Sequence, residues 1–312
     1  MPNLLLAAAA PHSLAPLLLA LVAIIVATKL LGELAQRAGQ PSVLGELLAG
    51  VLLGGSVLGV VDPADPVIRA LSELGVLVLL FEIGLDTDLR SLARVGSSAL
   101  TVGLVGVALP FVGGYYTARL LGLPAIESVV CGAALTATSI GISARVLSDL
   151  GRLDSPEGQV VLGAAVLDDV VGLVILSVIS GVLTGGAVTA GGVARTAGVA
   201  IGFVALAIVL GSIAVPPFFR AIERVRTSGT LGLAALAFAF ALAWLADVAG
   251  SAMIVGAFAA GLVLHPTPQR ERIERATTSL GHFFVPIFFA GVGAQVELGA
   301  LASSRALIVG VV

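Results

Sequence analysis

Apolar residues along the chain fall into ten long stretches, separated by short breaks rich in arginine, proline or glycine. Most stretches hold about 18 to 28 residues, enough for a helix to cross roughly 30 Å of hydrocarbon. The pattern predicts spanning helices at 14–32, 42–60, 68–86, 97–120, 124–148, 158–184, 190–217, 228–247, 250–265 and 277–296. An eleventh apolar run begins near Leu301 and reaches only to Val312, so we expect part of an eleventh helix there and a natural sequence that continues.

The composition agrees with a membrane location, because 58% of the 312 residues are apolar and only 11% are charged. An average soluble domain has about 25% charged residues, and a chain this apolar could not cover a surface exposed to water. The formal net charge of -3 offers no basic face for nucleic acid, and the single cysteine excludes an internal disulfide framework. The sequence therefore predicts an all-α polytopic membrane protein.

The lysines and arginines predict how the chain is oriented. Of the 16 such residues, most lie in the first, third, fifth, seventh and ninth connections: Lys29, Arg37, Arg90, Arg94, Arg145, Arg152, Arg220, Arg224, Arg226, Arg270, Arg272 and Arg275. Positive residues favour the cytoplasmic side of a membrane. We therefore expect a multi-pass protein of the cell inner (plasma) membrane, with its N-terminus outside.

Two pairs of segments indicate an internal repeat. Gly45–Gly50 matches Gly256–Gly261 at an offset of 211 residues, and Leu80–Leu89 matches Phe289–Leu298 at an offset of 209. The matched helices are an odd number of spans apart, so the two copies would face opposite ways. Inverted repeats are typical of secondary transporters, whose substrate sites lie near the middle of the bilayer.

Two adjacent carboxylates, Asp168 and Asp169, lie near the middle of the predicted helix 158–184. Each ionised Asp there costs roughly 2.5–3.5 kcal/mol, which an apolar helix does not need for its structure. One alternative is a structural pair that is satisfied by hydrogen bonds or by a cation within the membrane, but the spans contain almost no cations. Protons and a hard cation such as Na+, Li+ or K+ would compete for the carboxylate oxygens, as an exchanger requires.

Further candidates for the site come from two other predicted helices. The helix at 124–148 carries four hydroxyls and a glycine within eight residues: Thr136, Thr138, Ser139, Gly141 and Ser143. This cluster could mark an unwound turn that directs oxygens inward, or the hydroxyls could bond back to carbonyls of an intact helix. Glu82 could gate the site or pair with an arginine, or it could snorkel to the interface. Arg145 could pair with Asp149 or with a carboxylate of another helix.

Four segments together resemble one family: Gly39–Gly54, Leu80–Asp86, Thr138–Ser139 and Leu167–Val170. They are similar to the monovalent cation:proton antiporter superfamily, and within it to the NapA-like bacterial sodium/proton antiporters of the second cation:proton antiporter family. The resemblance runs from about Leu30 to Leu298. The paired aspartates are similar to the ion-binding pair of the electrogenic members.

The resemblance implies about thirteen helices in two inverted repeats around a linking helix, a homodimer, and an elevator motion of one domain against another. On this basis we expect a first repeat at 1–186, the linking helix at 187–226 and an incomplete second repeat at 227–312. Thr138 and Ser139 would then lie in a discontinuous helix and line a site at which Asp168 and Asp169 bind the transported Na+.

The sequence thus predicts a secondary transporter that exchanges Na+ or Li+ for H+, has no cofactor and is not an enzyme, because no nucleophile has a neighbouring base. Two alternatives stay open. One is a K+/H+ antiporter or gated K+ efflux system of the same fold. The other is a membrane sensor of pH or cations that does not transport.

Overall fold

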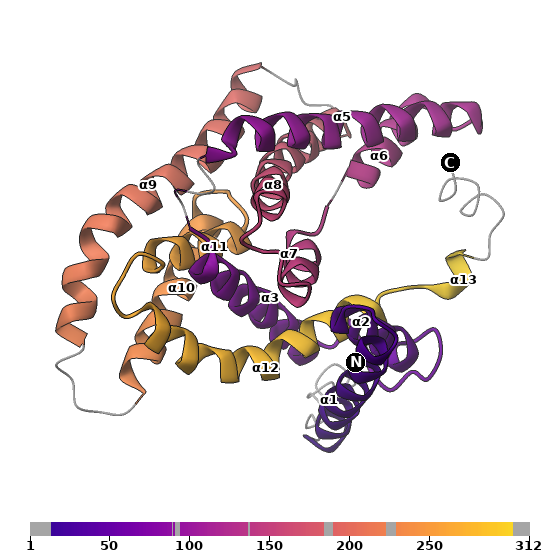
Figure 1. The fold of residues 1–312 in the computed structure, drawn as a ribbon. Helices are drawn as coiled ribbons and strands as arrows, with labels where there is room; N and C mark the ends of the chain where they lie inside the picture. Colours follow the sequence, from indigo (N-terminus) through magenta and orange to yellow (C-terminus); the bar gives the residue numbers. More distant parts are fainter. Residues whose placement is uncertain are drawn as a thin grey trace, which may run out of the picture. The chain divides into compact units, whose positions relative to one another are not determined.

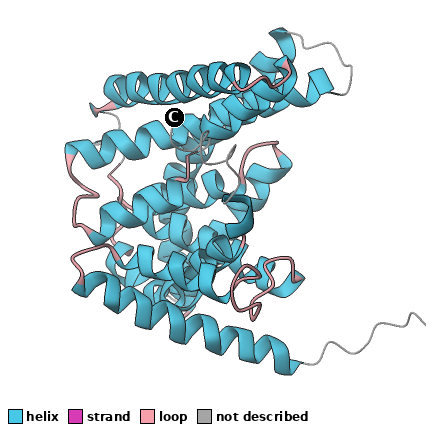
Figure 2. Ribbon diagram, turned by 90° about the vertical axis from the view of Figure 1, so that its right-hand side faces the viewer, coloured by secondary structure: helices cyan, strands magenta, loops and turns pink. Residues whose placement is uncertain are grey.

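The computed structural model describes residues 14–88, 90, 94–136, 138–183, 190–222 and 229–301. Within these ranges it leaves out the side chains at 169, 170, 173, 174, 176–183, 190, 192–194, 196, 197, 200, 201, 300 and 301. In the part of the chain that is described, every regular element is a helix and no strand occurs (Figure 2). The all-helical class predicted from the sequence is confirmed.

The helices follow one another in the order drawn in Figure 1. They are α1 (Leu14–Arg37), α2 (Ser42–Leu53), α3 (Pro66–Asp86), α5 (Gly96–Leu120), α6 (Ala125–Thr136), α7 (Ile140–Asp149), α8 (Pro156–Leu183), α9 (Ala190–Ile222), α10 (Thr230–Val248), α11 (Met253–Leu264), α12 (Arg270–Ala294) and α13 (Leu298–Leu301). Five stretches of single described helices are long and apolar enough to cross a membrane: Leu14–Arg37, Gly96–Leu120, Gly202–Ile222, Thr230–Val248 and Arg270–Ala294. A sixth stretch of this kind, Ala125–Asp149, takes α6 and α7 together.

The prediction of one helix over 42–60 is wrong for its second half, which is not helical. Helix α2 ends at Leu53, and the chain then turns back, so that the N–H groups of Val60 and Val61 both donate to the carbonyl oxygen of Leu53 at 2.9 Å. The reversal begins at Gly54, whose extended backbone cannot continue the helix. Apolar residues continue through this turn, which is why hydropathy alone extends the helix too far.

The chain forms two compact units, and each is described by itself. The first comprises Met1–Ser72 and Pro286–Glu297, and the second comprises Glu73–Val285 and Leu298–Val312. In the first unit, Ile24, Leu53 and Ile287 belong to one buried apolar cluster. Helix α2 approaches the end of α12 closely, because a Cβ built on Gly293 would lie 3.0 Å from the Cα of Gly50.

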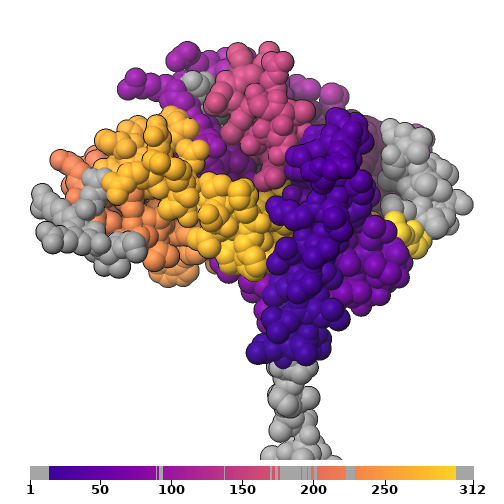
Figure 3. Space-filling model, turned by 60° about the horizontal axis from the view of Figure 1, so that its bottom comes forward, coloured from indigo at the N-terminus to yellow at the C-terminus, as the bar shows by residue number. Residues whose placement is uncertain are grey.

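The second unit is held together by several close helix contacts at small residues. Helices α5 and α6 meet where a Cβ built on Gly114 would lie 3.0 Å from the Cα of Gly132. Helix α10 lies against the first part of α12, where a Cβ on Gly232 would lie 2.5 Å from that of Ala276 (orange and yellow in Figure 3). Such contacts let backbones approach closely, as helices in lipid commonly do.

Candidate functional site

The helix expected at 124–148 is broken at the hydroxyl cluster. Helix α6 ends at Thr136 and α7 begins at Ile140, with Thr138 and Ser139 between them in a non-helical connection (Figure 1). The Oγ of Ser139 accepts the N–H of Ile142 at 3.3 Å and so caps α7. The alternative of an intact helix is therefore wrong. The hydroxyl of Thr136 donates to Ala133 O at 2.7 Å, and that of Thr138 donates to Thr136 O at 3.3 Å.

A break of this kind leaves polar backbone groups near the middle of a membrane protein. The first N–H groups of α7 and the last carbonyls of α6 have no partner within their own helices. The start of a helix carries a partial positive charge and the end of one a partial negative charge. The connection between α6 and α7 can therefore bind a carboxylate with one side and a cation with the other.

Asp168 of α8 lies directly beside this break. Its side chain is buried, with 8% of the residue exposed, and its Oδ2 accepts the backbone N–H of Thr138 at 2.9 Å. The structure thus brings together two of the residues singled out from the sequence. Thr138 and Ser139 are themselves exposed in the described part of the chain. The backbone of Asp169 continues α8, but its side chain lies outside the described residues.

A cavity of about 170 Å³ adjoins Asp168. At about 30 Å³ per molecule it has room for roughly five waters. Helices α5, α7 and α8 and the break between α6 and α7 supply its walls: Val102, Gly103, Gly106, Thr138, Ser143, Val161, Ala164, Ala165 and Asp168. The walls are mostly apolar, and the polar groups among them belong to Thr138, Ser143 and Asp168. This is the arrangement expected of a small-ligand site with a few convergent polar groups.

The bond from Thr138 to Asp168 predicts a difference between two substitutions. Asp168→Ala leaves the Thr138 N–H without its acceptor and should destabilise the protein by about 1–2 kcal/mol. Asp168→Asn keeps an amide oxygen that can accept the same bond, so its melting temperature should stay close to that of the wild type. Thermal denaturation of the full-length protein in detergent measures both, and equal melting temperatures for the two variants would contradict the contact.

The structure places Glu82 and Arg145 near one another. Glu82 of α3 packs against α12, where a Cβ built on Gly281 would lie 2.6 Å from each of its carboxylate oxygens. Arg145 of α7 forms the expected ion pair with Asp149, with Nε 3.1 Å from Oδ1. The positive charge of Arg145 also acts on the carboxylate of Glu82, which is on α3.

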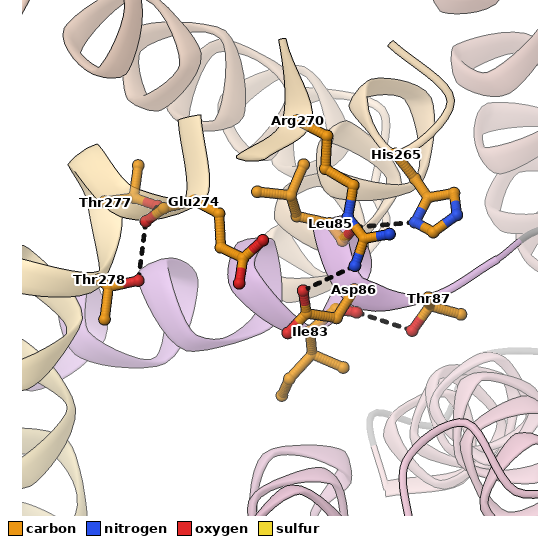
Figure 4. A network of polar contacts seen from close by, with 9 residues as sticks. All are labelled: Ile83, Leu85, Asp86, Thr87, His265, Arg270, Glu274, Thr277 and Thr278. Carbon is orange, nitrogen blue, oxygen red and sulfur yellow. Dashed lines mark hydrogen bonds and ion pairs between the residues drawn. The ribbon is translucent and has the colours of Figure 1, made fainter. Parts of the chain in front are cut away.

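A polar network at the ends of α3, α11 and α12 was not predicted from the sequence (Figure 4). Arg270 Nη2 lies 3.3 Å from Asp86 Oδ1, and the Nδ1 of His265 lies 2.9 Å from the carbonyl oxygen of Leu85. The sequence contained one indication of this network, because the connections after 86 and before 277 were both assigned to the same membrane face. Opposite charges at one face can pair, whichever helices carry them.

Comparisons with known proteins agree with this architecture. The family model described as sodium/hydrogen exchanger, transmembrane, matches residues 17–312. The chain is 40% identical to the high-affinity Na(+)/H(+) antiporter NhaS3 of Synechocystis sp., over 94% of this chain and 71% of that protein. It is 36% identical to the Na(+)/H(+)-K(+) antiporter GerN of Bacillus cereus, over 90% of this chain and 72% of that protein.

A solved structure has a similar fold. The sodium proton antiporter MjNhaP1 from Methanocaldococcus jannaschii matches with a TM-score of 0.66 over 92% of this chain and 72% of that one. Its sequence identity is 18%, so this likeness supports the fold alone.

Proposed function

This chain belongs to the sodium/hydrogen exchanger family, and we propose that it exchanges Na+ or Li+ for H+ across a membrane as a secondary active transporter. The observation that carries the proposal is the position of Asp168. Its carboxylate is buried in an apolar helix, is bonded to the backbone of a broken helix at 2.9 Å, and lines a cavity. A buried carboxylate at such a break can exchange a proton for a cation.

The chemistry follows from competition for the same oxygens. Protons and a monovalent cation both bind to carboxylate oxygens, which Asp168 and its neighbour Asp169 supply. A monovalent cation bound there therefore displaces protons, and protons displace the cation. Hydroxyl and carbonyl oxygens at Thr138 and Ser139 are hard ligands that suit Na+ or Li+. The transported ions are the substrates, and no cofactor takes part.

Alternating access then converts this competition into exchange. The site opens to one side, takes up the cation and releases protons, and then opens to the other side, where protons replace the cation. We propose that the movement is of the elevator type. Glu82 and Arg145 lie on α3 and α7, so their attraction can hold these helices together in one state and give way in the other.

Close helix contacts support the inverted repeat in this proposal. The offsets of 211 and 209 relate Gly50 to Gly261 and Gly84 to Gly293. A Cβ on Gly293 would lie 3.0 Å from the Cα of Gly50, and one on Gly84 would lie 3.1 Å from the Cα of Gly261. Gly50 therefore contacts Gly293 in the first compact unit, and their repeat counterparts, Gly261 and Gly84, contact each other in the second. A repeat of structure produces this correspondence without further assumptions.

The remaining features of the proposal come from the family and from the charge pattern. The first repeat would occupy 1–186, the linking helix 187–226 and the second repeat 227–312. We propose a homodimer in the plasma membrane with the N-terminus outside. Large apolar side chains exposed on α1, α5 and α9, including Leu18, Leu109 and Ile213, suit contact with lipid.

A second candidate, K+/H+ exchange on the same fold, is favoured by the names of some relatives. GerN is named for K+ as well as Na+, and a glutathione-regulated potassium-efflux system protein of Haemophilus influenzae is 31% identical over 95% of this chain and 48% of that protein. The acidic pair itself would accept either ion.

An ion panel tests these functions. Full-length protein is reconstituted in liposomes with an imposed pH gradient, and NaCl, LiCl, KCl or choline chloride is added. We expect Na+ and Li+ to collapse the gradient faster than K+, with choline at the level of vesicles without protein. Collapse by K+ alone would replace the proposal with K+/H+ exchange. Ion binding without any collapse would instead identify a sensor.

A further inference from the structure

Ser143 of α7 lines the same cavity as Asp168 and Thr138. It lies one turn after Ser139, the residue that caps α7, and its N–H donates to Ser139 O at 3.1 Å. The backbone of Ser143 is therefore part of the regular helix, and its side chain is half-buried. Only its hydroxyl distinguishes it from the valines, alanines and glycines that make up the rest of the wall.

The hydroxyl of Ser143 is not used in the way that is usual inside a helix. Buried hydroxyls in the other helices, those of Thr28, Ser128 and Thr277, donate to the carbonyl oxygen four residues earlier, at 2.7, 2.9 and 3.1 Å. In the part of the chain that is described, the hydroxyl of Ser143 makes no hydrogen bond. Its oxygen therefore keeps both lone pairs available to a ligand in the cavity.

The carboxylate of Asp168 is also engaged on one side only. Its Oδ2 accepts the N–H of Thr138 at 2.9 Å, whereas its Oδ1 accepts no hydrogen bond from the described residues. The hydroxyl of Thr138 donates to Thr136 O at 3.3 Å, which leaves its lone pairs available as well. The described wall therefore offers a cation three hard side-chain oxygens, one charged and two neutral.

The remaining wall of the cavity adds space but no side-chain oxygen. It consists of residues of α5 and α8: Val102, Gly103, Gly106, Val161, Ala164 and Ala165. A Cβ built on Gly106 meets no atom within 4 Å. The volume of about 170 Å³ holds only roughly five waters. A cation that leaves bulk water for this cavity has few ligands to choose from, so each oxygen of the wall should contribute strongly to its binding.

We propose that the hydroxyl of Ser143 is a ligand of the transported cation and favours the cation over the proton at this site. A hydroxyl oxygen turns its lone pairs toward a cation, which is a contact with a full charge. Protonated Asp168 is neutral and could donate only an uncharged hydrogen bond to the same oxygen, about half as strong. The exchange itself depends on Asp168, and Ser143 sets how well the cation competes. This inference rests on the proposed function, in which a cation binds at Asp168.

Binding of Na+ tests this ligand separately from transport. Full-length protein in detergent is titrated with NaCl at a fixed alkaline pH, with choline chloride holding the ionic strength constant. The rise in melting temperature gives the apparent Kd, because a ligand that binds only the folded protein stabilises it. Ser143→Ala removes the oxygen, and Ser143→Thr keeps it. The matched control is Ser148→Ala, because Ser148 lies on the same helix but is exposed and does not line the cavity.

We expect Ser143→Ala to weaken Na+ binding about tenfold, because a contact with a charge is lost, and Ser143→Thr and Ser148→Ala to stay within about twofold of the wild type. In proteoliposomes, Ser143→Ala should raise the KM for Na+ by a similar factor and leave the maximal rate unchanged. A merely structural role would instead lower the maximal rate and the melting temperature without NaCl.

Unchanged Na+ affinity in Ser143→Ala, or an equal loss of affinity in Ser143→Thr, would overturn the ligand. A lower maximal rate of Ser143→Ala with an unchanged KM would overturn it as well. Wild-type protein that binds Na+ but shows no exchange in the ion panel would overturn the proposed function, while the affinities of the variants would still decide whether Ser143 is a ligand.

Discussion

Replacing Asp168 and Asp169 together by Asn is expected to reduce Na+-driven collapse of a pH gradient to the level of vesicles without protein. The amide has nearly the shape of the carboxylate but no charge and no proton to exchange. A cation in a low-dielectric site without a counter-charge pays its full desolvation cost. The variant should therefore neither bind Na+ nor carry H+, although its oxygen at 168 can still accept the Thr138 N–H. The measurement is dye-reported exchange by the full-length protein in proteoliposomes.

The matched control changes the net charge by the same amount elsewhere. Asp62 and Asp247 are both exposed, the first before α3 and the second near the end of α10. Asp62→Asn combined with Asp247→Asn should leave the exchange rate close to that of the wild type. Undiminished exchange by the Asp168 and Asp169 variant would remove the acidic pair from the mechanism. A similar loss in the control variant would mean that overall charge, and not the site, was responsible.

Much of the fold could be predicted from the sequence because hydropathy and helix length are coupled in a bilayer. The start of α5 was expected at 97 and lies at Gly96, and the end of α8 was expected at 184 and lies at Leu183. The predictions failed where local chemistry overrides hydropathy. The turn after Leu53 stays apolar, and the first turns of α12, from Arg270 onward, are charged but helical.

The candidate site was predicted in part for a similar reason. An ionised carboxylate is costly in an apolar helix, so Asp168 can be recognised as a candidate from the sequence alone. A cluster of hydroxyls likewise indicates the break at Thr138. The bond between them joins residues thirty positions apart, through a backbone N–H that any residue except proline carries. Gly106 gave no signal, because the chain has 39 glycines and only the structure separates those that touch a neighbour from those that face free space.

The glycines at the crossing of α3 and α11 should be among the positions least tolerant of substitution. A Cβ on Gly84 would overlap the carbonyl oxygen of Phe258, and a Cβ on Gly261 would overlap that of Phe81. Backbone atoms cannot rotate away as a side chain can, so an added methyl group must push the two helices apart. Overpacking of this kind typically costs about 1–3 kcal/mol. We therefore expect Gly84→Ala and Gly261→Ala each to lower the melting temperature of the full-length protein in detergent.

Gly113→Ala is the matched control for this crossing, because nothing lies within 4 Å of a built Cβ and alanine is the better helix former by about 1 kcal/mol. Its melting temperature should be equal to or higher than that of the wild type. Since Gly84 and Gly261 meet at one crossing, the first methyl group already separates the helices for the second. The double variant should then cost less than the sum of the two single variants. Full additivity would mean that the two glycines act at separate places, and wild-type stability of both single variants would mean that α3 and α11 do not approach as closely as the structure has them.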